Sequence, residues 1–265
     1  MLANSSQYEE VKLGPDRDHA YRQRKLGLPC PGLAALFNHS YLHAKDIDEQ
    51  IAFWKWGTAL VECYNFTTVF AMLFSLFSAL WLKRRPTLHF SIRDLGVHGR
   101  IEHDASMTRY DASQGDALNP DPTLIERLFD QLAYYRAQRL GRQPQEPELS
   151  IVTLDDFARH KLDLQKQIRQ YAAQSKPVVA FLGAGEVAFA LQAHLLPKSS
   201  SHAEHHDEIS ANSRWLRVWF EEERLPVELG WKKPMQSYTL FGTLTLIAKI
   251  FMVQYAHRND KSKLK

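Results

Sequence analysis

The sequence predicts a mostly helical protein with a single main domain. Apolar residues at 124, 125, 128, 129, 132 and 135 recur at helical spacing, and strand-like alternation is confined to residues 88–97. The chain has 265 residues, of which 45% are apolar, so it can bury one large core or at most two small ones. We therefore expect an all-α fold.

Seven helices follow from apolar runs along the chain. They are expected, in order, at residues 33–41, 47–60, 65–82, 123–140, 154–173, 177–196 and 214–223. The helix at 154–173 also has an N-terminal signal, because Thr153 is followed by Asp155 and Asp156. We divide the chain into an N-terminal extension (1–19), a main domain (20–235) and a C-terminal apolar helix with a basic tail (236–265).

The charge of the chain is unevenly distributed. The formal net charge is +3, but residues 249–265 hold five basic residues and one acidic residue, 5 − 1 = +4, which leaves 3 − 4 = −1 for the rest. A nucleic-acid-binding protein spreads basic charge over a folded face, so no nucleic-acid partner is expected. Two cysteines are too few for a disulfide scaffold. The first residues lack the apolar stretch of a secretory signal, which predicts an intracellular protein.

Two apolar stretches are long enough to be considered as membrane segments. Residues 63–82 carry no charge, but several polar side chains interrupt them, which favours a buried core helix over a membrane span. Residues 238–256 lead into the basic tail. This second segment could lie on an anionic membrane surface, or it could pack on the domain as a terminal helix; the sequence does not separate the two.

Cys30 lies between Pro29 and Pro31, directly before a predicted helix. A proline is tolerated in the first helical turn because its missing N–H would be unpaired there anyway. The sulfur at this position faces free backbone N–H groups and the positive end of the helix dipole, which both favour a thiolate. Cys30 is therefore a candidate nucleophile or metal ligand, with a free cysteine in a tight turn as the alternative. Cys63 lies inside an apolar run and is expected to be an inert core thiol.

The turn at residues 99–109 combines acidic, imidazole and hydroxyl side chains. Glu102 and Ser106 are four residues apart, so on a helical turn their oxygens could bind one hard cation together with the backbone carbonyl of His103. The His103 ring would then be free for acid–base chemistry. On these residues alone, a capped surface turn is the alternative.

Glu186 interrupts an otherwise apolar predicted helix. A carboxylate among apolar neighbours is costly unless it is paired or lines a functional cavity, and burial would raise its pKa toward a useful acid–base range. Gly183 and Gly185 leave room for a bulky group to approach the backbone. The alternative is that Glu186 occupies a wet stripe of the helix.

Together these segments resemble the heme-thiolate peroxidases, the family of the fungal chloroperoxidases and unspecific peroxygenases. The segment LPCPGLAALFNHSYL at 28–42 is similar to the family's PCP opening, and IEHDASMTRYD at 101–111 is similar to the EHD-x-S form of its short peroxygenases. Gly185-Glu186 resembles the family's distal glutamate segment, and ERLP at 223–226 with Gly230-Trp231 resembles its ERLP…GW stretch. The resemblance covers about residues 20–235.

The resemblance implies a role for each matching position. Cys30 would be the axial thiolate ligand of a heme b iron, and this ligand favours cleavage of a peroxide O–O bond. Glu102, the His103 carbonyl and Ser106 would hold Mg²⁺ together with a heme propionate. Glu186, with His103 as its partner, would be the acid–base that acts on hydrogen peroxide. The second substrate would be a small hydrophobic or aromatic organic molecule, in a tailoring step of secondary metabolism.

Some features stay open at this stage. Aromatic residues that could face a substrate are also typical of a core: Phe66, Phe70, Phe181 and Phe189. His202, His205 and His206 could bind a metal, although a solvated loop is the commoner explanation. One alternative function is a non-catalytic heme-binding or membrane-associated protein that keeps the fold. Another is a cysteine-nucleophile enzyme that uses Cys30 with His103 as its base.

Overall fold

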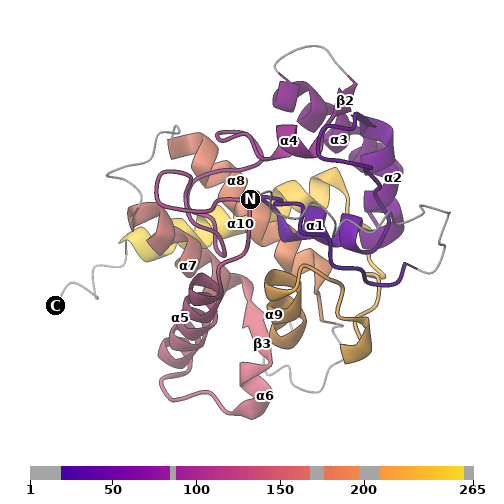
Figure 1. The fold of residues 1–265 in the computed structure, drawn as a ribbon. Coiled ribbons are helices and arrows are strands. Elements are labelled where there is room, and N and C mark those ends of the chain that lie inside the picture. Colours follow the sequence, from indigo (N-terminus) through magenta and orange to yellow (C-terminus); the bar gives the residue numbers. More distant parts are fainter. Residues whose placement is uncertain (1–18, 84–87, 168–175, 197–208, 260–265) are drawn as a thin grey trace, which may run out of the picture.

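The computed structural model describes residues 19–83, 88–167, 176–196 and 209–259, and these are mostly helical (Figure 1). The helices are α1 (Pro31–Asn38), α2 (Phe53–Tyr64), α3 (Thr68–Lys83), α4 (Ile92–Leu95), α5 (Pro122–Leu140), α6 (Glu146–Leu149), α7 (Leu154–Gln167), α8 (Lys176–Ala193), α9 (Ser213–Glu221) and α10 (Leu240–Asn259), with a 3-10 turn, η2 (Val227–Leu229). The all-α prediction is confirmed. Residues 168–173 of one predicted helix and the three histidines of the loop, His202, His205 and His206, lie outside the described residues.

Two small antiparallel sheets accompany the helices. Strand β1 (Ile51–Ala52) pairs with β2 (His89–Phe90), and β3 (Ile151–Thr153) pairs with β4 (Ser210–Asn212). The helix expected from residue 47 was therefore placed too early, because Ile51 and Ala52 pair with β2 before α2 begins. The strand expected over 88–97 is also wrong beyond Phe90. A capping box between Ser91 and Asp94 starts the short helix α4 at that point.

Local sequence signals determine where helix α5 begins and ends. The Asp121 side chain accepts a hydrogen bond from the Leu124 N–H at 3.0 Å, and Pro122 begins the helix. The helix ends at Gly141, whose φ of 66° is the left-handed conformation that glycine adopts readily. The prediction of a helix at 123–140 is confirmed to within one residue.

The charge-free run at 63–82 divides between two helices rather than forming one. Asn65 adopts a left-handed φ of 61° that ends α2, and its side-chain amide donates to the Pro234 carbonyl at 2.9 Å. Helix α3 buries one side in the core but leaves Val69 72% exposed and Phe77 66% exposed. The expected core helix therefore packs in the core along one side only.

One hydrophobic core joins the helices from α1 to α10. Figure 1 shows α8 through the middle of the molecule, with α5 and α7 on one side and α2 and α3 on the other. Helix α10 packs against both α7 and α8. Phe189 of α8, one turn after Glu186, packs on Gly32 at the start of α1, whose N-cap is Cys30, so the two predicted site segments lie in the same part of the core.

Candidate active site

Cys30 is positioned by the start of α1. It is the N-cap residue with an extended backbone (φ −133°, ψ 124°), and Pro31 follows as the first helical residue, as predicted. The backbone N–H groups of Leu33 and Gly32 lie near the sulfur and favour its thiolate form. Cys30 is partly exposed, whereas Cys63 is 1% exposed and is the inert core thiol expected. Of the two cysteines, Cys30 is the one that a ligand can reach.

The expected preference of Cys30 for the thiolate form is wrong for the protein alone. Burial raises the pKa of the Cys30 thiol, and this outweighs the opposing effects of the Leu33 and Gly32 N–H groups and of Arg109. A metal cation bound to the sulfur supplies the missing positive charge and favours the thiolate. The site is therefore built for a ligand more than for a free nucleophile.

Arg109 connects residues 28–32, here called the cysteine loop, to the rest of the site. Its side chain is 1% exposed, and its Nε donates to the Leu28 carbonyl at 3.1 Å, two residues before Cys30. One terminal nitrogen donates to Thr108 Oγ1 at 2.9 Å, and the other forms an ion pair with Glu223. Arg109 belongs to the 101–111 segment that contains EHD-x-S, and Glu223 is the first residue of the ERLP segment. The two segments therefore contact each other beside the loop that carries the Cys30 sulfur.

The ERLP segment also holds the far end of α1. The Asn38 side-chain amide donates to the Glu223 carbonyl at 3.0 Å, and the Leu225 N–H donates to His39 Nε2 at 2.9 Å. Burial raises the pKa of Glu223 to about 7, although Arg109 opposes this shift. The conspicuous residues of this motif therefore position α1 and its cysteine; they do not reach a substrate.

Arg109→Met is expected to destabilise the fold by about 3–5 kcal/mol, because it leaves the buried Glu223 carboxylate without its partner. The measurement is the free energy of urea unfolding. The matched control is Arg93→Met, which breaks an Arg–Asp pair whose two side chains are 64% and 62% exposed and should change stability far less. Equal destabilisation by the two variants would show that the Arg109 contacts are not a structural clamp.

The turn at 99–109 is irregular, so the helical turn expected from Glu102 to Ser106 is wrong. Ala105 has a positive φ of 60°, and its N–H donates to Asp111 Oδ1 at 2.6 Å, which keeps the backbone out of the helical conformation. Glu102 is 3% exposed, and its Oε2 lies 2.5 Å from His98 Nδ1. Burial raises the pKa of Glu102, and the nearby Asp104 carboxylate adds to this effect.

Glu186 lies in the middle of the apolar helix α8, as predicted. Its carboxylate forms an ion pair with the Lys161 ammonium from α7 and accepts the Met107 backbone N–H. Its Oε2 also lies 4.0 Å from His103 Nε2, so the structure brings the two predicted catalytic residues together. Burial would raise the pKa of Glu186, but the Lys161 ammonium outweighs this effect and holds the pKa below its ordinary value. The expectation of a raised pKa is wrong because the sequence did not reveal Lys161.

His103 is neutral and oriented in this arrangement. Burial lowers the pKa of its ring, and the Lys161 ammonium lowers it further. Nδ1 lies 2.8 Å from the Asp104 carbonyl, which can only accept, so we assign the proton to Nδ1. Nε2 then presents a lone pair toward Glu186. The 4.0 Å between Nε2 and Oε2 is too long for a direct hydrogen bond but can be bridged by one oxygen atom.

Lys161 is the site residue that sequence reasoning missed. Its side chain is fully buried, and its ammonium donates to the Ala105 carbonyl as well as to Glu186. A signal was present, because Lys161 falls on the buried face of α7 with Leu154, Phe157 and Ala158, at helical spacing. Gly183 was a second signal, since a Cβ at that position would lie 2.3 Å from Lys161 Cε.

The aromatic residues considered as substrate-facing divide into different environments. Phe66 and Phe70 stack on each other in the core and are 7% and 8% exposed. Phe181 is 49% exposed on the outside of α8. Phe189 lies one helical turn after Glu186 and packs so tightly on Gly32 that a Cβ there would approach its ring to 2.2 Å. Of the four, Phe189 is the one beside the cysteine loop.

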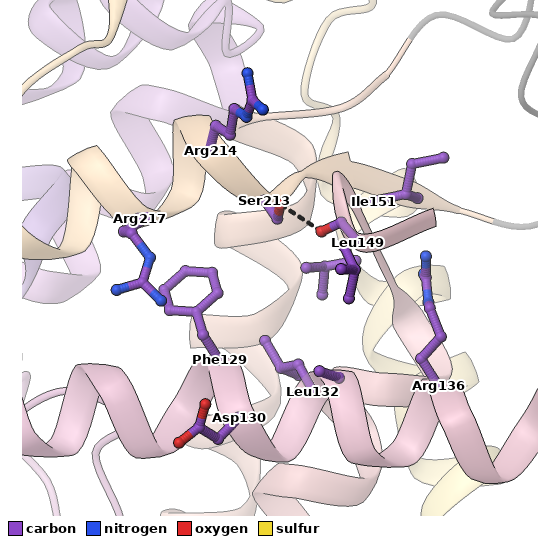
Figure 2. A pocket seen from close by; sticks show the side chains of 11 residues that line it. Phe129, Asp130, Leu132, Arg136, Leu149, Ile151, Ser213, Arg214 and Arg217 are labelled. Atoms are coloured by element: carbon purple, nitrogen blue, oxygen red, sulfur yellow. Dashed lines mark hydrogen bonds between the residues drawn. The ribbon is translucent and has the colours of Figure 1, made fainter. Parts of the chain in front are cut away.

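A shallow cavity of about 230 Å³ lies between α5, β3 and α9, away from these residues (Figure 2). The figure shows Arg217 beside Phe129, and its guanidinium lies 4.4 Å from the centre of that ring. Arg217 is also paired with Glu126 and Glu221, and Arg136 with Asp156. None of the predicted catalytic residues lines this cavity, so it is not the candidate active site.

The donor groups fit a thiolate-ligated heme. Cys30 presents a partly accessible sulfur beside two backbone N–H groups that favour its thiolate form, which suits a sulfur ligand to a metal. Glu186 and His103 keep 16% and 10% side-chain exposure in the same region, unlike the sealed residues around them. In the described part of the chain, no hydrogen bond joins Cys30 to His103, which disfavours a cysteine–histidine nucleophile.

Comparison with known proteins identifies the family of this chain. The sequence profile of peroxidase family 2 matches residues 22–236, which is most of the chain. The chain is also 31% identical over 150 residues to an aromatic peroxygenase from Cyclocybe aegerita. That match covers 49% of this chain and 38% of the relative's length. Because the family profile spans both the cysteine loop and Glu186, this chain belongs to peroxidase family 2, the fungal heme-thiolate chloroperoxidase family.

Proposed function

We propose that this protein uses hydrogen peroxide to oxidise or oxygenate a small hydrophobic or aromatic organic molecule, with a heme b group ligated by Cys30. The observation that supports it best is the Lys161–Glu186–His103 cluster, which places an ionised carboxylate and a neutral imidazole together in a partly accessible interior. When bound, the heme supplies the redox chemistry, and a thiolate ligand directs it toward O–O cleavage. A tailoring step in secondary metabolism stays a prediction.

Glu186 moves the proton in the proposed reaction. Its carboxylate takes a proton from one oxygen of hydrogen peroxide and returns it to the other oxygen, which leaves as water. A carboxylate can start this sequence only when it is ionised. Lys161 meets that requirement because it offsets the cost of burial that would otherwise keep Glu186 protonated.

His103 orients the peroxide in this proposal. Its unprotonated Nε2 faces the carboxylate, so an O–H group between them can donate to either acceptor. Because the ring stays neutral, it does not compete with Glu186 by releasing a proton of its own. The backbone contact from Nδ1 to the Asp104 carbonyl holds the ring in place.

Lys161→Met tests the role of the buried ammonium. The carboxylate is active above its pKa and loses activity as the pH falls through it, and Lys161 holds this pKa below its ordinary value. Without Lys161, burial raises the pKa, so the acidic limb of the rate profile should move to higher pH and turnover near neutral pH should fall about 10- to 100-fold. The measurement is dye oxidation against pH.

Two further variants separate catalysis from folding. Lys166→Met removes an exposed lysine from the same helix and should leave the profile unchanged. Lys161→Arg keeps a cation and should retain more activity than Lys161→Met. An acidic limb that stays in place in a heme-loaded Lys161→Met protein would refute the proposed role.

We also propose a magnesium ion held by Glu102, the His103 carbonyl and Ser106. Glu102, which pairs with His98, is buried beside Asp104, whose Oδ2 is buried without a hydrogen-bond partner, and a cation near that oxygen would satisfy it. Magnesium at about 100 times its Kd should raise the Tm of the chelator-treated protein by about 5 °C or more. Glu102→Gln should remove this shift. The same shift in that variant would place the ion elsewhere.

The decisive test of the proposed function is spectroscopic. The heme-supplemented protein should be red-brown, and its reduced carbon monoxide complex should show the red-shifted absorption of thiolate ligation. A colourless preparation after heme supplementation would reject the proposal. A coloured protein that cleaves no peroxide would support the alternative, a heme-binding protein without catalysis.

A further inference from the structure

Exposed apolar side chains concentrate on two helices. Of the 21 large hydrophobic residues that are exposed in the described part of the chain, ten lie on α3 and α10. The starts of these two helices are tied together, because the Thr67 N–H donates to the Tyr238 carbonyl at 2.8 Å and the rings of Phe66 and Tyr238 stack. Such a concentration indicates an interaction surface more than scattered exposure does.

Helix α10 carries the more regular of the two apolar surfaces. Its solvent-facing side, here called the α10 outer stripe, consists of residues spaced three or four apart: Phe241, Leu244, Ala248, Met252 and Tyr255. Phe241 is 82% exposed, Tyr255 71% and Met252 62%. Within the described residues, α10 is the one helix long and apolar enough to cross a membrane, yet only 22% of its apolar window is buried.

The opposite side of α10 is part of the protein core. Leu246, Ile247 and Ile250 belong to the main hydrophobic cluster and are at most 7% exposed. Polar contacts add to this packing, since the Gln254 side chain donates to the Ala158 carbonyl at 3.3 Å and Arg159 donates to His257 at 2.8 Å. A helix that crossed a bilayer would have to leave these contacts and expose the core. The packing therefore favours a helix that lies in the membrane plane.

The charge around α10 matches an anionic partner. Lys249 is exposed beside the outer stripe, and the helix ends with His257 and Arg258. The chain then continues with Lys261, Lys263 and Lys265 against one acidic residue, Asp260. An apolar stripe followed by a basic segment is the pattern of interfacial helices that bind anionic lipid.

We propose that the α10 outer stripe binds the surface of an anionic lipid bilayer, with α10 parallel to the membrane plane and its inner side still packed on α7 and α8. The sequence left open whether residues 238–256 pack on the domain or lie on a membrane surface. In this proposal the inner side of α10 packs on the domain and its outer side contacts lipid. Membrane binding does not depend on the proposed chemistry. It would hold α8, the helix that carries Glu186, one helix away from the lipid.

Vesicle flotation of the full-length protein tests the proposal. Vesicles of roughly four parts phosphatidylcholine to one part phosphatidylserine should bind it, and phosphatidylcholine alone or high salt should bind it more weakly. The double variant Phe241→Ser/Met252→Ser should lower the partition coefficient by about tenfold or more. The matched control, Val227→Ser/Leu229→Ser, removes two exposed apolar residues on η2, 58% and 46% exposed, and should bind like the native protein.

Four results would overturn the proposal. Absence of native binding to the anionic vesicles would do so directly, as would equal loss of binding in the two double variants. A protein that ignores vesicles but forms a dimer that Phe241→Ser/Met252→Ser dissolves would assign the stripe to a second copy of the chain. Resistance of the bound protein to extraction at alkaline pH would show a spanning helix instead of an interfacial one. Thermal unfolding of each variant confirms that it is folded, and the heme spectrum reports the proposed function separately.

Discussion

Glu186→Gln is expected to retain heme while slowing peroxide cleavage by about 10²- to 10⁴-fold, the range for a lost general acid–base. The glutamine side chain has nearly the same shape, and its carbonyl oxygen can still accept hydrogen bonds from Lys161 and the Met107 N–H. It cannot take the proton of hydrogen peroxide. The loss therefore falls on the reaction step and not on the fold. Rapid mixing of the heme-loaded protein with hydrogen peroxide measures it.

The control for this variant is Glu126→Gln, which makes the same chemical change at an exposed carboxylate that pairs with Arg217. It should cleave peroxide at the native rate. Because Lys161 keeps its charge in Glu186→Gln, the thermal stability of the variant should be compared with that of the double variant Lys161→Met/Glu186→Gln. Native turnover in Glu186→Gln with full heme loading would assign the proton transfer to another group, and His103 would be the first residue to test.

Cys30→Ala is expected to abolish the thiolate signature of the reduced carbon monoxide complex and, with it, the oxidation of organic substrates. The sulfur is the ligand in the proposal, and no other described cysteine can replace it, because Cys63 is 1% exposed. The chain thus contains its own matched control. Cys63→Ala makes the same substitution in the core and should keep both the spectrum and the activity. The reduced spectra of the two variants, recorded after the same heme supplementation, decide the matter.

A different outcome would be informative about the ligand. If Cys30→Ala kept the red-shifted absorption, Cys30 could not be the axial ligand. If both cysteine variants lost heme equally, the effect would lie in folding, and the unfolding temperatures of the two proteins would show it. The prediction therefore requires that the two variants differ in spectrum while both remain folded.

Much of the fold was predictable because its signals are local. Asp121, Pro122 and Gly141 delimit α5 within a few residues of sequence, and Pro31 does the same for the start of α1. The errors arise from contacts with residues outside the segment being predicted. Ile51–Ala52 forms a strand because β2 lies beside it, and no feature of residues 47–60 announces that neighbour. The irregular turn at Ala105 depends on Asp111, whose contact the spacing of Glu102 and Ser106 does not reveal.

The sequence by itself determined the helical class, the cysteine at the start of α1, the glutamate inside α8 and the family to which they point. These follow from residue types and spacings within short segments, where backbone capping and periodic burial act. Only the tertiary structure decided which charges meet. Lys161 and Glu186 are 25 residues apart and Arg109 and Glu223 are 114 apart, yet each pair meets in a largely buried place. Helix packing brings them together, and a buried charge takes its pKa and its chemistry from whatever partner that packing supplies.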